Sequence, residues 1–297
     1  MAQLLALGAV ALGESAHALA RLGRVALTSA SGLAVAYTDV RPVLPGHAIV
    51  APTPSTEQSL PVRLSDMGDT EYDALFETVA AVCEAGSRGG ATAHNIAIMD
   101  GAAAGQPVML PSVHVHVVPR CAGDLENNDD IYGRIERWSP EGAETEPPPF
   151  EWPDDDARRP RTAAQMAAEA ERYAAVCAGD DGDSGGASLL PRAPETFRFG
   201  KFDLDASQLF FASRLCVASV NLKPLCPGHV LVIPRRNVPL LRDLTAEERR
   251  ELWRAVRRVQ AAVMEEHGAS GCKLGVQDGR DSGQSVPHVH VHVLPCK

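Results

Sequence analysis

The clearest pattern of polar and apolar positions lies at the end of the chain, where residues 288–294 read H-V-H-V-H-V-L. Successive side chains of a β-strand point to opposite faces, so this one-by-one alternation predicts a strand. The valines are β-branched residues that suit a pleated sheet and pack on a core. The predicted strand therefore presents His288, His290 and His292 on one face and buries three valines on the other.

The same pattern occurs earlier in the chain, where residues 112–118 read S-V-H-V-H-V-V. A second pair of matching segments precedes these two. Residues 42–52 read P-V-L-P-G-H-A-I-V-A-P, and residues 224–234 read P-L-C-P-G-H-V-L-V-I-P. The order of the parts is the same and their spacing is similar. Self-similarity on this scale indicates two copies of one domain, which we name the first copy and the second copy.

Each copy also contains an apolar stripe with helical spacing between its matching segments. In the second copy, Thr245 and Glu248 form a capping box at the start of this stripe, and Gly268 ends it. In the first copy, the stripe from Tyr72 to Val82 predicts a helix that ends at Gly86. With the flanking strands, this pattern predicts an α+β fold with an antiparallel sheet in each copy.

The chain is expected to divide into four segments: a degenerate first copy (1–121), a tail (122–178), a linker (179–196) and an intact second copy (197–297). The tail contains a proline- and acid-rich run, 144–156, which we interpret as solvated surface rather than a metal site. An alanine-rich helix from Thr162 to Cys177 follows it. The linker is rich in Gly, Asp and Ser and is expected to be flexible.

Composition narrows the classes of partner. The formal net charge of −10 argues against nucleic acid and anionic membranes, because such partners require a basic face. Seven scattered cysteines without C-x-x-C favour a reduced intracellular protein. Residues 1–20 are rich in Ala and Leu, but they lack a basic start and Glu14 interrupts them. We expect a cytoplasmic protein without a membrane span, with the nucleus and an organelle signal in residues 1–20 as the alternatives.

A row of three imidazoles has two chemical uses. At a strand rise of roughly 3.3 Å per residue, His288 and His292 stand about 13 Å apart, whereas a zinc–nitrogen bond is about 2 Å. The three rings of a regular strand therefore cannot bind one metal ion. In the other use, His290 is a nucleophile and its neighbours hold the transferred group or the leaving group. We favour the nucleophile and expect no metal in the site.

The second copy resembles the histidine triad superfamily, and in particular its Fhit branch, the dinucleoside polyphosphate hydrolases. The resemblance is carried by the residue 288–295 segment, by V-N-L-K-P-L-C-P-G-H (220–229) and by V-Q-D-G-R-D-S-G-Q-S-V (276–286). The tail resembles the C-terminal tail of Fhit proteins. Single-copy relatives form dimers whose sheets meet edge to edge. The resemblance therefore implies an intramolecular pseudo-dimer, a monomeric chain, and a tail near the second copy's active site.

The resemblance also implies roles for individual residues of the second copy, with His290 as the histidine that becomes covalently nucleotidylated. The implied catalytic residues are His290, His288, His292, Gln277 and Gln284. The implied substrate-binding residues are Asn221, His229 and Ser285. For His229, a purely structural place in the core is an equal alternative.

The first copy departs from this pattern. Ser112 replaces the first histidine, Met99 the first glutamine and Asp39 the asparagine, and two extra residues precede Ser112. The first copy thus carries a degenerate second site, in which the retained residues are His114, His116, His47 and Gln106. We interpret the first copy as a catalytically impaired scaffold. Residual activity, or nucleotide binding without turnover, is the alternative.

The implied activity is hydrolysis of dinucleoside polyphosphates of the diadenosine triphosphate type in two in-line steps. Other nucleotidyl-histidine chemistry stays open, namely phosphoramidate cleavage, adenylyl-sulfate cleavage or nucleotidyl transfer. A nucleotide-binding signalling protein with incidental turnover is a third hypothesis. No tightly bound cofactor is expected, although Mg or Mn is compatible with the substrate.

Overall fold

The computed structural model describes residues 19, 22–54, 59–140, 158–179 and 195–297. Three segments lie wholly or almost wholly outside the described residues: residues 1–20 with their possible organelle signal, the acid-rich run 144–156, and the linker. Within the described part, no helix is both long and apolar enough to span a membrane.

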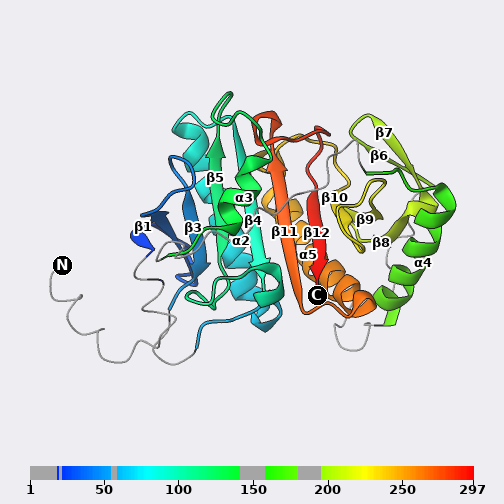
Figure 1. Ribbon diagram of the computed structural model, residues 1–297, viewed down its shortest axis with the longest axis horizontal. Helices are drawn as coiled ribbons and strands as arrows, with labels where there is room; N and C mark the ends of the chain where they lie inside the picture. Colours follow the sequence, from blue (N-terminus) through cyan, green and yellow to red (C-terminus); the bar gives the residue numbers. More distant parts are fainter. Residues whose placement is uncertain (1–18, 20–21, 55–58, 141–157, 180–194) are drawn as a thin grey trace.

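One antiparallel sheet of ten strands runs through both copies, in the order β1-β2-β3-β5-β4-β11-β12-β10-β9-β8 (Figure 1). The first copy supplies β1 (Gly23–Thr28), β2 (Ala34–Asp39), β3 (Ala48–Pro52), β4 (Ala93–Asp100) and β5 (Val115–Arg120). The second copy supplies β8 (Leu209–Ala212), β9 (Cys216–Val220), β10 (Val230–Pro234), β11 (Gly271–Asp278) and β12 (Val291–Cys296). A separate hairpin consists of β6 (Thr196–Phe199) and β7 (Phe202–Asp205).

The two copies meet where β4 pairs with β11, from Cys272 opposite Asp100 to Asp278 opposite His94. Every pairing in the sheet is antiparallel, so the two halves are related by a pseudo-twofold axis between these strands. This edge-to-edge junction confirms the predicted α+β fold of two repeated units joined as an intramolecular pseudo-dimer.

Three helices cover one face of the sheet: α2 (Asp69–Arg88), α4 (Ala163–Gly179) and α5 (Ala246–His267). The capping box at Thr245 and the left-handed Gly268 bound α5 as predicted. The remaining elements are α3 (Asp130–Glu136), η1 (Leu64–Asp66), η2 (Ala102–Ala104), η3 (Ala206–Gln208), η4 (Leu241–Asp243) and η5 (Arg280–Ser282). In Figure 1, α3 lies in front of the sheet, and α2 and α5 lie behind it.

The predicted end of the first-copy helix at Gly86 is wrong, because α2 continues to Arg88 and is capped by Gly89. Gly86 serves another purpose. A Cβ at this position would lie 2.7 Å from Nε2 of His94, so the helix approaches β4 too closely for any side chain. The sequence signal for a helix end was in fact a signal for close packing of helix on sheet.

Charge complementarity specifies how the two helices meet. Asp73 of α2 pairs with Arg254 of α5 at 2.7 Å, and Glu77 pairs with Arg250 at 3.0 Å. Two identical copies would instead bring like charges together at this contact. Each exposed pair contributes at most about 1 kcal/mol, but the pattern favours the first copy as partner of the second.

The alternating valines of both segments join one core cluster with α2 and α5: Val113, Val115, Val117, Val289, Val291 and Val293. Their histidines therefore face the opposite side of the sheet. Along that face His116 lies opposite Ala97, Ala97 opposite Gly275, and Gly275 opposite His292. Three strand spacings of about 4.8 Å separate the two histidine clusters by roughly 14 Å. The sheet thus places two related sites side by side.

Candidate active site

His290 of the second copy stands just before β12, with its ring held by the backbone. Its Nδ1 lies 2.7 Å from the carbonyl oxygen of His288. A carbonyl only accepts hydrogen bonds, so Nδ1 carries the proton and donates. The neutral ring then keeps a lone pair on Nε2. Phe199 of the β6–β7 hairpin meets the ring edge to face, with centroids 5.2 Å apart. The arrangement fixes an imidazole in the tautomer that a nucleophile needs.

His288 uses both ring nitrogens on the backbone. Its Nδ1 accepts from the Gly200 N–H at 3.2 Å, and its Nε2 donates to the Pro234 carbonyl at 2.8 Å. Gly200 has a φ of 58°, and a Cβ there would lie 2.5 Å from Val286, so only glycine fits this turn. The expectation that the His288 ring holds the transferred group is therefore corrected, because no ring nitrogen remains. His288 instead positions His290 through its carbonyl.

A chain of hydrogen bonds sets the proton on His292. The Leu225 N–H donates to Nδ1 of His229 at 3.0 Å, so neutral His229 carries its proton on Nε2. That nitrogen lies 2.9 Å from Nδ1 of His292 and donates to it. His292 therefore carries its own proton on Nε2. It can donate to an anionic oxygen beside His290, whose ring centroid is 4.9 Å away.

Burial keeps this cluster neutral. Desolvation lowers the pKa of His290 to about 4 and that of His229 to about 3, and it holds the pKa of His292 well below its usual value. The His288 pKa is also lowered, again mainly by burial. At pH 7 the rings are uncharged, which leaves the lone pair of His290 available for attack.

The two glutamines of the second copy lie in different surroundings. Gln277 of β11 is half-buried and hydrogen-bonds the Tyr132 hydroxyl of α3. Gln284 lies on the loop after η5 and donates from Nε2 to the Pro239 carbonyl at 2.9 Å. Ser285 is exposed beside it. Asn221, at the end of β9, accepts from the Lys223 N–H at 3.0 Å, and its Nδ2 stands 3.3 Å from His229 Nε2.

The tail reaches the second copy's site from another side. Arg161 donates from Nε to the Asn221 carbonyl at 2.9 Å and pairs with Glu169 of α4. Arg158 donates from Nη1 to the Lys223 carbonyl at 2.8 Å. The positive charge of Arg158 contributes to the lowered pKa of both His229 and His292. These contacts confirm the expected position of the tail near the second copy's site.

The start of the tail is bound by Arg120 of the first copy, which is fully buried at the end of β5. Its guanidinium donates to Asn95 at 2.6 Å, to Asp124 at 2.8 Å and to Asn128 at 2.8 Å. Asn95 in turn donates to the Ser282 carbonyl of the second copy at 3.2 Å. The first copy thereby supports the loop that carries Gln284.

In the first copy, His114 has the same tautomer as His290. Its Nδ1 lies 2.8 Å from the Ser112 carbonyl, so Nε2 keeps the lone pair. The space in front of it is filled. The indole of Trp138, just beyond α3, lies 5.9 Å from His114 and 4.8 Å from His116 between ring centroids. Nε2 of His114, Nε2 of His116 and the Ser112 hydroxyl are buried without hydrogen-bond partners.

Asp39 reverses the hydrogen-bond chain in this copy. Its carboxylate lies 2.8 Å from Nδ1 of His47 and accepts the Trp138 N–H at 2.6 Å. The Val43 N–H also points at Nδ1 of His47, but from 3.4 Å, and the closer carboxylate at 2.8 Å sets the proton on Nδ1. A neutral His47 that donates to Asp39 accepts at Nε2 from His116, which lies 3.1 Å away. His116 then presents a lone pair, where His292 presents an N–H. Two lone pairs side by side repel a phosphate oxygen instead of binding it.

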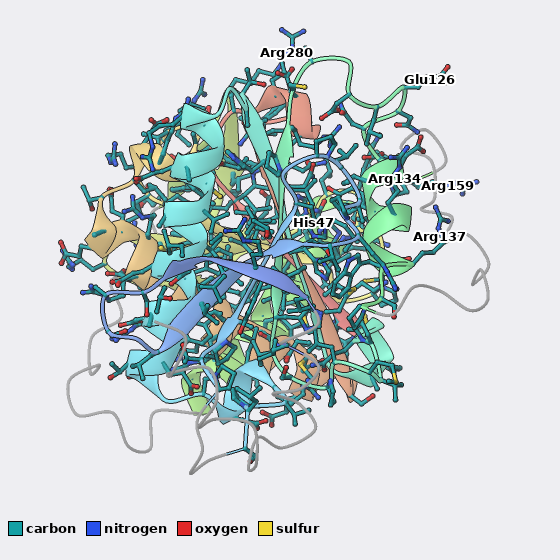
Figure 2. The ribbon with its side chains drawn as sticks, turned by 90° about the vertical axis from the view of Figure 1, so that its left-hand side faces the viewer. His47, Glu126, Arg134, Arg137, Arg159 and Arg280 are labelled. Carbon is teal, nitrogen blue, oxygen red and sulfur yellow. The ribbon has the colours of Figure 1, made fainter. Side chains whose placement is uncertain are left out.

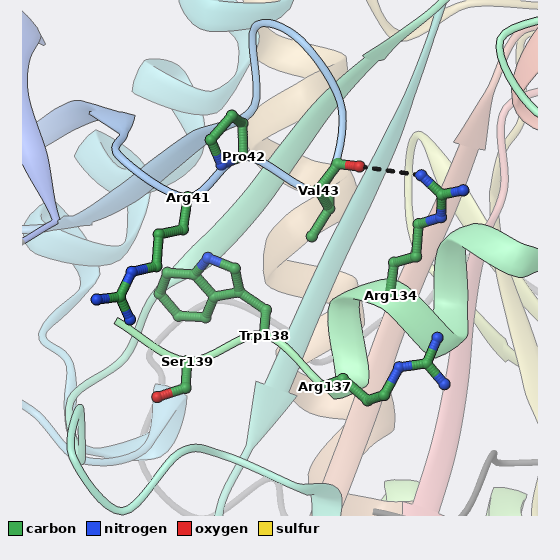
Figure 3. Close-up of a pocket in the computed structure, with 7 residues that line it drawn as sticks. All are labelled: Arg41, Pro42, Val43, Arg134, Arg137, Trp138 and Ser139. Atoms are coloured by element: carbon green, nitrogen blue, oxygen red, sulfur yellow. Dashed lines mark hydrogen bonds between the residues drawn. The ribbon is translucent and has the colours of Figure 1, made fainter. Parts of the chain in front are cut away.

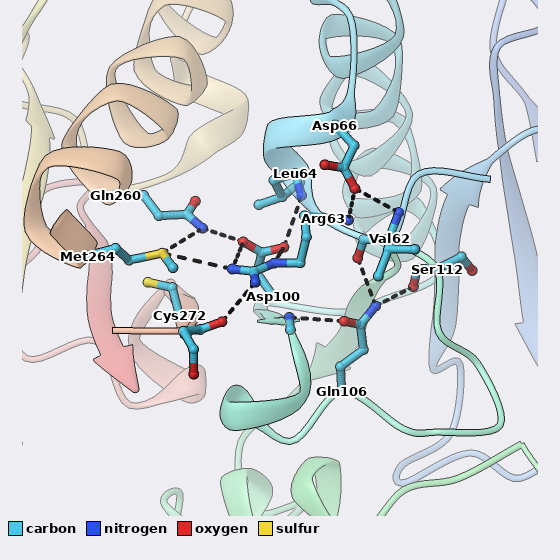
Figure 4. Close-up of polar contacts among 12 residues, drawn as sticks. Val62, Arg63, Leu64, Asp66, Asp100, Gln106, Ser112, Gln260, Met264 and Cys272 are labelled. Atoms are coloured by element: carbon cyan, nitrogen blue, oxygen red, sulfur yellow. Dashed lines mark hydrogen bonds and ion pairs between the residues drawn. The ribbon is translucent and has the colours of Figure 1, made fainter. Parts of the chain in front are cut away.

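The retained Gln106 is locked into the backbone, as Figure 4 shows. Its amide accepts from the Gly101 N–H at 2.9 Å and donates to the carbonyls of Val62 at 3.1 Å and Ser112 at 2.9 Å. Beside it, Asp100 accepts from the Leu64 N–H at 2.9 Å and pairs with Arg63. Gln106 is therefore a structural residue, with no amide group left for a ligand.

Sequence reasoning missed three residues that shape the sites: Trp138, Arg158 and Phe199. The basic run R-R-P-R (158–161) in an acidic chain was a usable signal for Arg158. Nothing in the local pattern marks Trp138 as the residue that fills the first site. Among the described residues, no group of three His, Cys, Asp or Glu is placed to hold a metal ion.

Comparison with known proteins adds the relationships. The HIT domain family matches residues 26–123 and 205–297. An asymmetrical bis(5'-nucleosyl)-tetraphosphatase of Schizosaccharomyces pombe is 51% identical over 35% of this chain and 57% of its own length. A bifunctional bis(5'-adenosyl)-triphosphatase/adenylylsulfatase FHIT of Arabidopsis thaliana is 47% identical over 34% of this chain and 57% of its own length. The C. elegans NitFhit crystal structure matches with a TM-score of 0.34 and 42% identity. The match covers 34% of this chain and 25% of the NitFhit chain. The chain thus spans less than two thirds of these relatives' lengths.

Proposed function

The chain belongs to the HIT domain family, and from that premise we propose that it hydrolyses dinucleoside polyphosphates of the diadenosine triphosphate type on the second copy. The observation that carries the proposal is the pair of tautomers at His290 and His292. One ring offers a lone pair on Nε2, and its neighbour offers an N–H on Nε2. A nucleophile beside a donor for a phosphoryl oxygen is the minimum that nucleotidyl transfer requires.

In the first step, Nε2 of His290 attacks the α-phosphorus and forms a P–N bond. The bond from that phosphorus to the bridging oxygen breaks, and the leaving nucleotide takes the electron pair. His292 donates to a non-bridging oxygen, and Gln284 and Ser285 contact the phosphate chain. The His288 carbonyl accepts the hydrogen bond from Nδ1–H and so stabilises the positive charge that develops on the attacking ring.

In the second step, water attacks the same phosphorus and the P–N bond breaks, and the water releases a proton to the solvent. The ring recovers its lone pair, and a nucleoside monophosphate leaves. Arg158 of the tail, which donates to the Lys223 carbonyl two residues after Asn221, supplies positive charge on this side of the site. Its contribution is to lower the energy of a dianionic transition state. A divalent cation, Mg or Mn, accompanies the polyphosphate as part of the substrate.

A substrate panel tests the activity. Diadenosine triphosphate, diadenosine tetraphosphate, adenylyl sulfate and adenosine phosphoramidate are compared by kcat/KM. We expect diadenosine triphosphate to give the highest value. Adenylyl sulfate is the second candidate, because one relative's name combines both activities. Nucleotide affinity without turnover of any of the four would replace the hydrolase proposal with a binding function.

We also infer that the chain works as a cytoplasmic monomer. The pairing of β4 with β11 occupies in one chain the sheet edge through which two separate chains would meet. Light scattering coupled to size exclusion measures the mass directly. A mass of one chain is expected, and a concentration-independent dimer would contradict the inference.

A further inference from the structure

A cavity of about 310 Å³ lies on the first copy and not at His290. We name it the arginine cavity. It is lined by Arg41, Pro42 and Val43 after β2, by Arg134 and Arg137 of the α3 region, and by residues 138–139 (Figure 3). In Figure 3 the Trp138 indole stands between Arg41 on one side and Arg134 and Arg137 on the other.

Three arginines around one cavity are unexpected in a chain with a net charge of −10. Within the described part of the chain, none of the three forms an ion pair. Arg134 makes one hydrogen bond, to the Val43 carbonyl at 3.3 Å. In Figure 2, Arg134 and Arg137 project from the outer side of the molecule, while His47 lies deeper.

Two carboxylates near these arginines are bound to other groups. Asp39 is engaged by His47 and by the Trp138 N–H. Glu136 of α3 pairs with Lys273 of β11. Asp130 at the start of α3 forms no ion pair with Arg134 either, so among the described residues three guanidinium groups without ion-pair partners line one cavity, an arrangement that favours a bound anion.

We propose that the arginine cavity is a non-catalytic binding site for an oligophosphate chain, carried by a nucleotide or free. Guanidinium groups bind phosphate oxygens through paired N–H donors, and their distribution on two sides of the indole suits a ligand with several negative groups. The volume is at the low end of small-molecule sites, which fits a mononucleotide better than a dinucleotide.

Trp138 separates this site from the histidines of the first copy. The indole covers His114 and His116, so a ligand in the arginine cavity does not reach either ring. Binding there occurs without covalent chemistry. The proposal goes beyond the hydrolase activity and does not depend on which substrate His290 cleaves.

Calorimetric titration of the full chain with ATP, and separately with inorganic tripolyphosphate, tests the site at low ionic strength. The variants are R134A/R137A and, as a matched control, R24A, which removes an exposed arginine from β1. We expect R134A/R137A to remove one binding component or weaken it at least about tenfold, with R24A unchanged. Hydrolysis at His290 should stay as in the wild type, which separates this result from any failure of the proposed function.

The two probes identify the ligand's source. Equal losses for ATP and tripolyphosphate assign recognition to the phosphate chain, and a loss confined to ATP assigns it to a nucleotide whose nucleoside part also contributes. Trp138→Phe gives an independent readout, because a ligand-induced change in indole emission should disappear in it. Binding of both probes to R134A/R137A as tight as to R24A would overturn the proposal.

Discussion

The two histidine sites lie on one face of one sheet, yet they differ in whether the ring beside the central histidine offers an N–H donor. Both central histidines, His114 and His290, keep a lone pair on Nε2 because a backbone carbonyl holds Nδ1. The difference is in the neighbour. His292 presents an N–H, whereas a neutral His47 that donates to Asp39 leaves His116 with a second lone pair. The comparison teaches that the two sites share the geometry of the central histidine and differ in the ring beside it and in the indole that covers the first site.

Access follows the same division. Trp138 occupies the first site and donates a hydrogen bond to Asp39. Asp39, which stands where the second copy has Asn221, therefore both changes the proton on His116 and anchors the indole. In the second site the tail supplies arginines instead. The tail therefore serves opposite purposes at the two sites, although both contacts come from the one segment between the copies.

The largest expected effect separates the central histidines. His290→Ala should lower turnover by more than about 10³-fold, because it removes the nucleophile. His114→Ala should leave turnover within about twofold, since its ring lies behind Trp138. Steady-state kinetics on both variants, with circular dichroism as a check of folding, makes the comparison. The opposite ranking would assign the chemistry to the first copy.

Next in size is the stability cost of opening the first site. Trp138→Ala should lower the free energy of unfolding by about 3–5 kcal/mol, the range for removing a large buried aromatic side chain. It also leaves Asp39 without its indole donor. Urea denaturation measures the loss. Turnover per folded molecule should not change, and a fall of tenfold or more would show that the first site takes part in catalysis.

Introducing the hydrogen-bond arrangement of the first copy into the second copy should have a smaller effect on kcat. Asn221→Asp introduces the first copy's carboxylate beside His229, so His292 is expected to lose its outward proton. The loss of one hydrogen-bond donor to a phosphoryl oxygen costs roughly 10²-fold in kcat. Asp39→Asn, the reciprocal change, should leave kcat unaltered. Equal activity of Asn221→Asp and wild type would contradict the role assigned to the proton on His292.

The smallest effects concern pH. Burial lowers the pKa of His290 and His114 to about 4, whereas both rings titrate near 6.5 in the unfolded chain. The unfolded state therefore binds more protons between these pH values, and the folded state loses stability as pH falls below about 6.5. Each such histidine contributes up to about 1.4 kcal/mol per pH unit. Urea midpoints at pH 7, 6 and 5 should decrease in that order, and His114→Ala should flatten the trend.

Much of the fold could be predicted because its signals are local. Alternating valines predicted the buried strands, Thr245 and Gly268 predicted both ends of α5, and the repeat predicted two copies of one domain. The pseudo-dimer followed from the family resemblance, whose single-copy members pair edge to edge. Gly86 failed as a helix end because its reason is a contact with β4, which no local pattern contains. The four boundaries proposed for the segments stay predictions, although the family match begins and ends close to both copies.

The site was less predictable where its chemistry depends on distant segments. The sequence motifs identified His290 as the candidate nucleophile and Asp39 as a departure in the first copy. They could not show that both ring nitrogens of His288 form hydrogen bonds to the backbone. Likewise Trp138 reaches the first site from the far end of α3, across a gap in sequence that no periodicity bridges. Long-range contacts of this kind are decided by the folded chain as a whole.

Locating the covalent intermediate tests the central claim most directly. Wild-type protein is mixed with a radiolabelled diadenosine triphosphate for a single turnover, quenched in alkali, where a phosphoramidate on histidine survives, and digested. The label should appear on the peptide that contains residues 288–294 and nowhere else. Label on the peptide that contains residues 112–118, or turnover without label on either, would contradict the account.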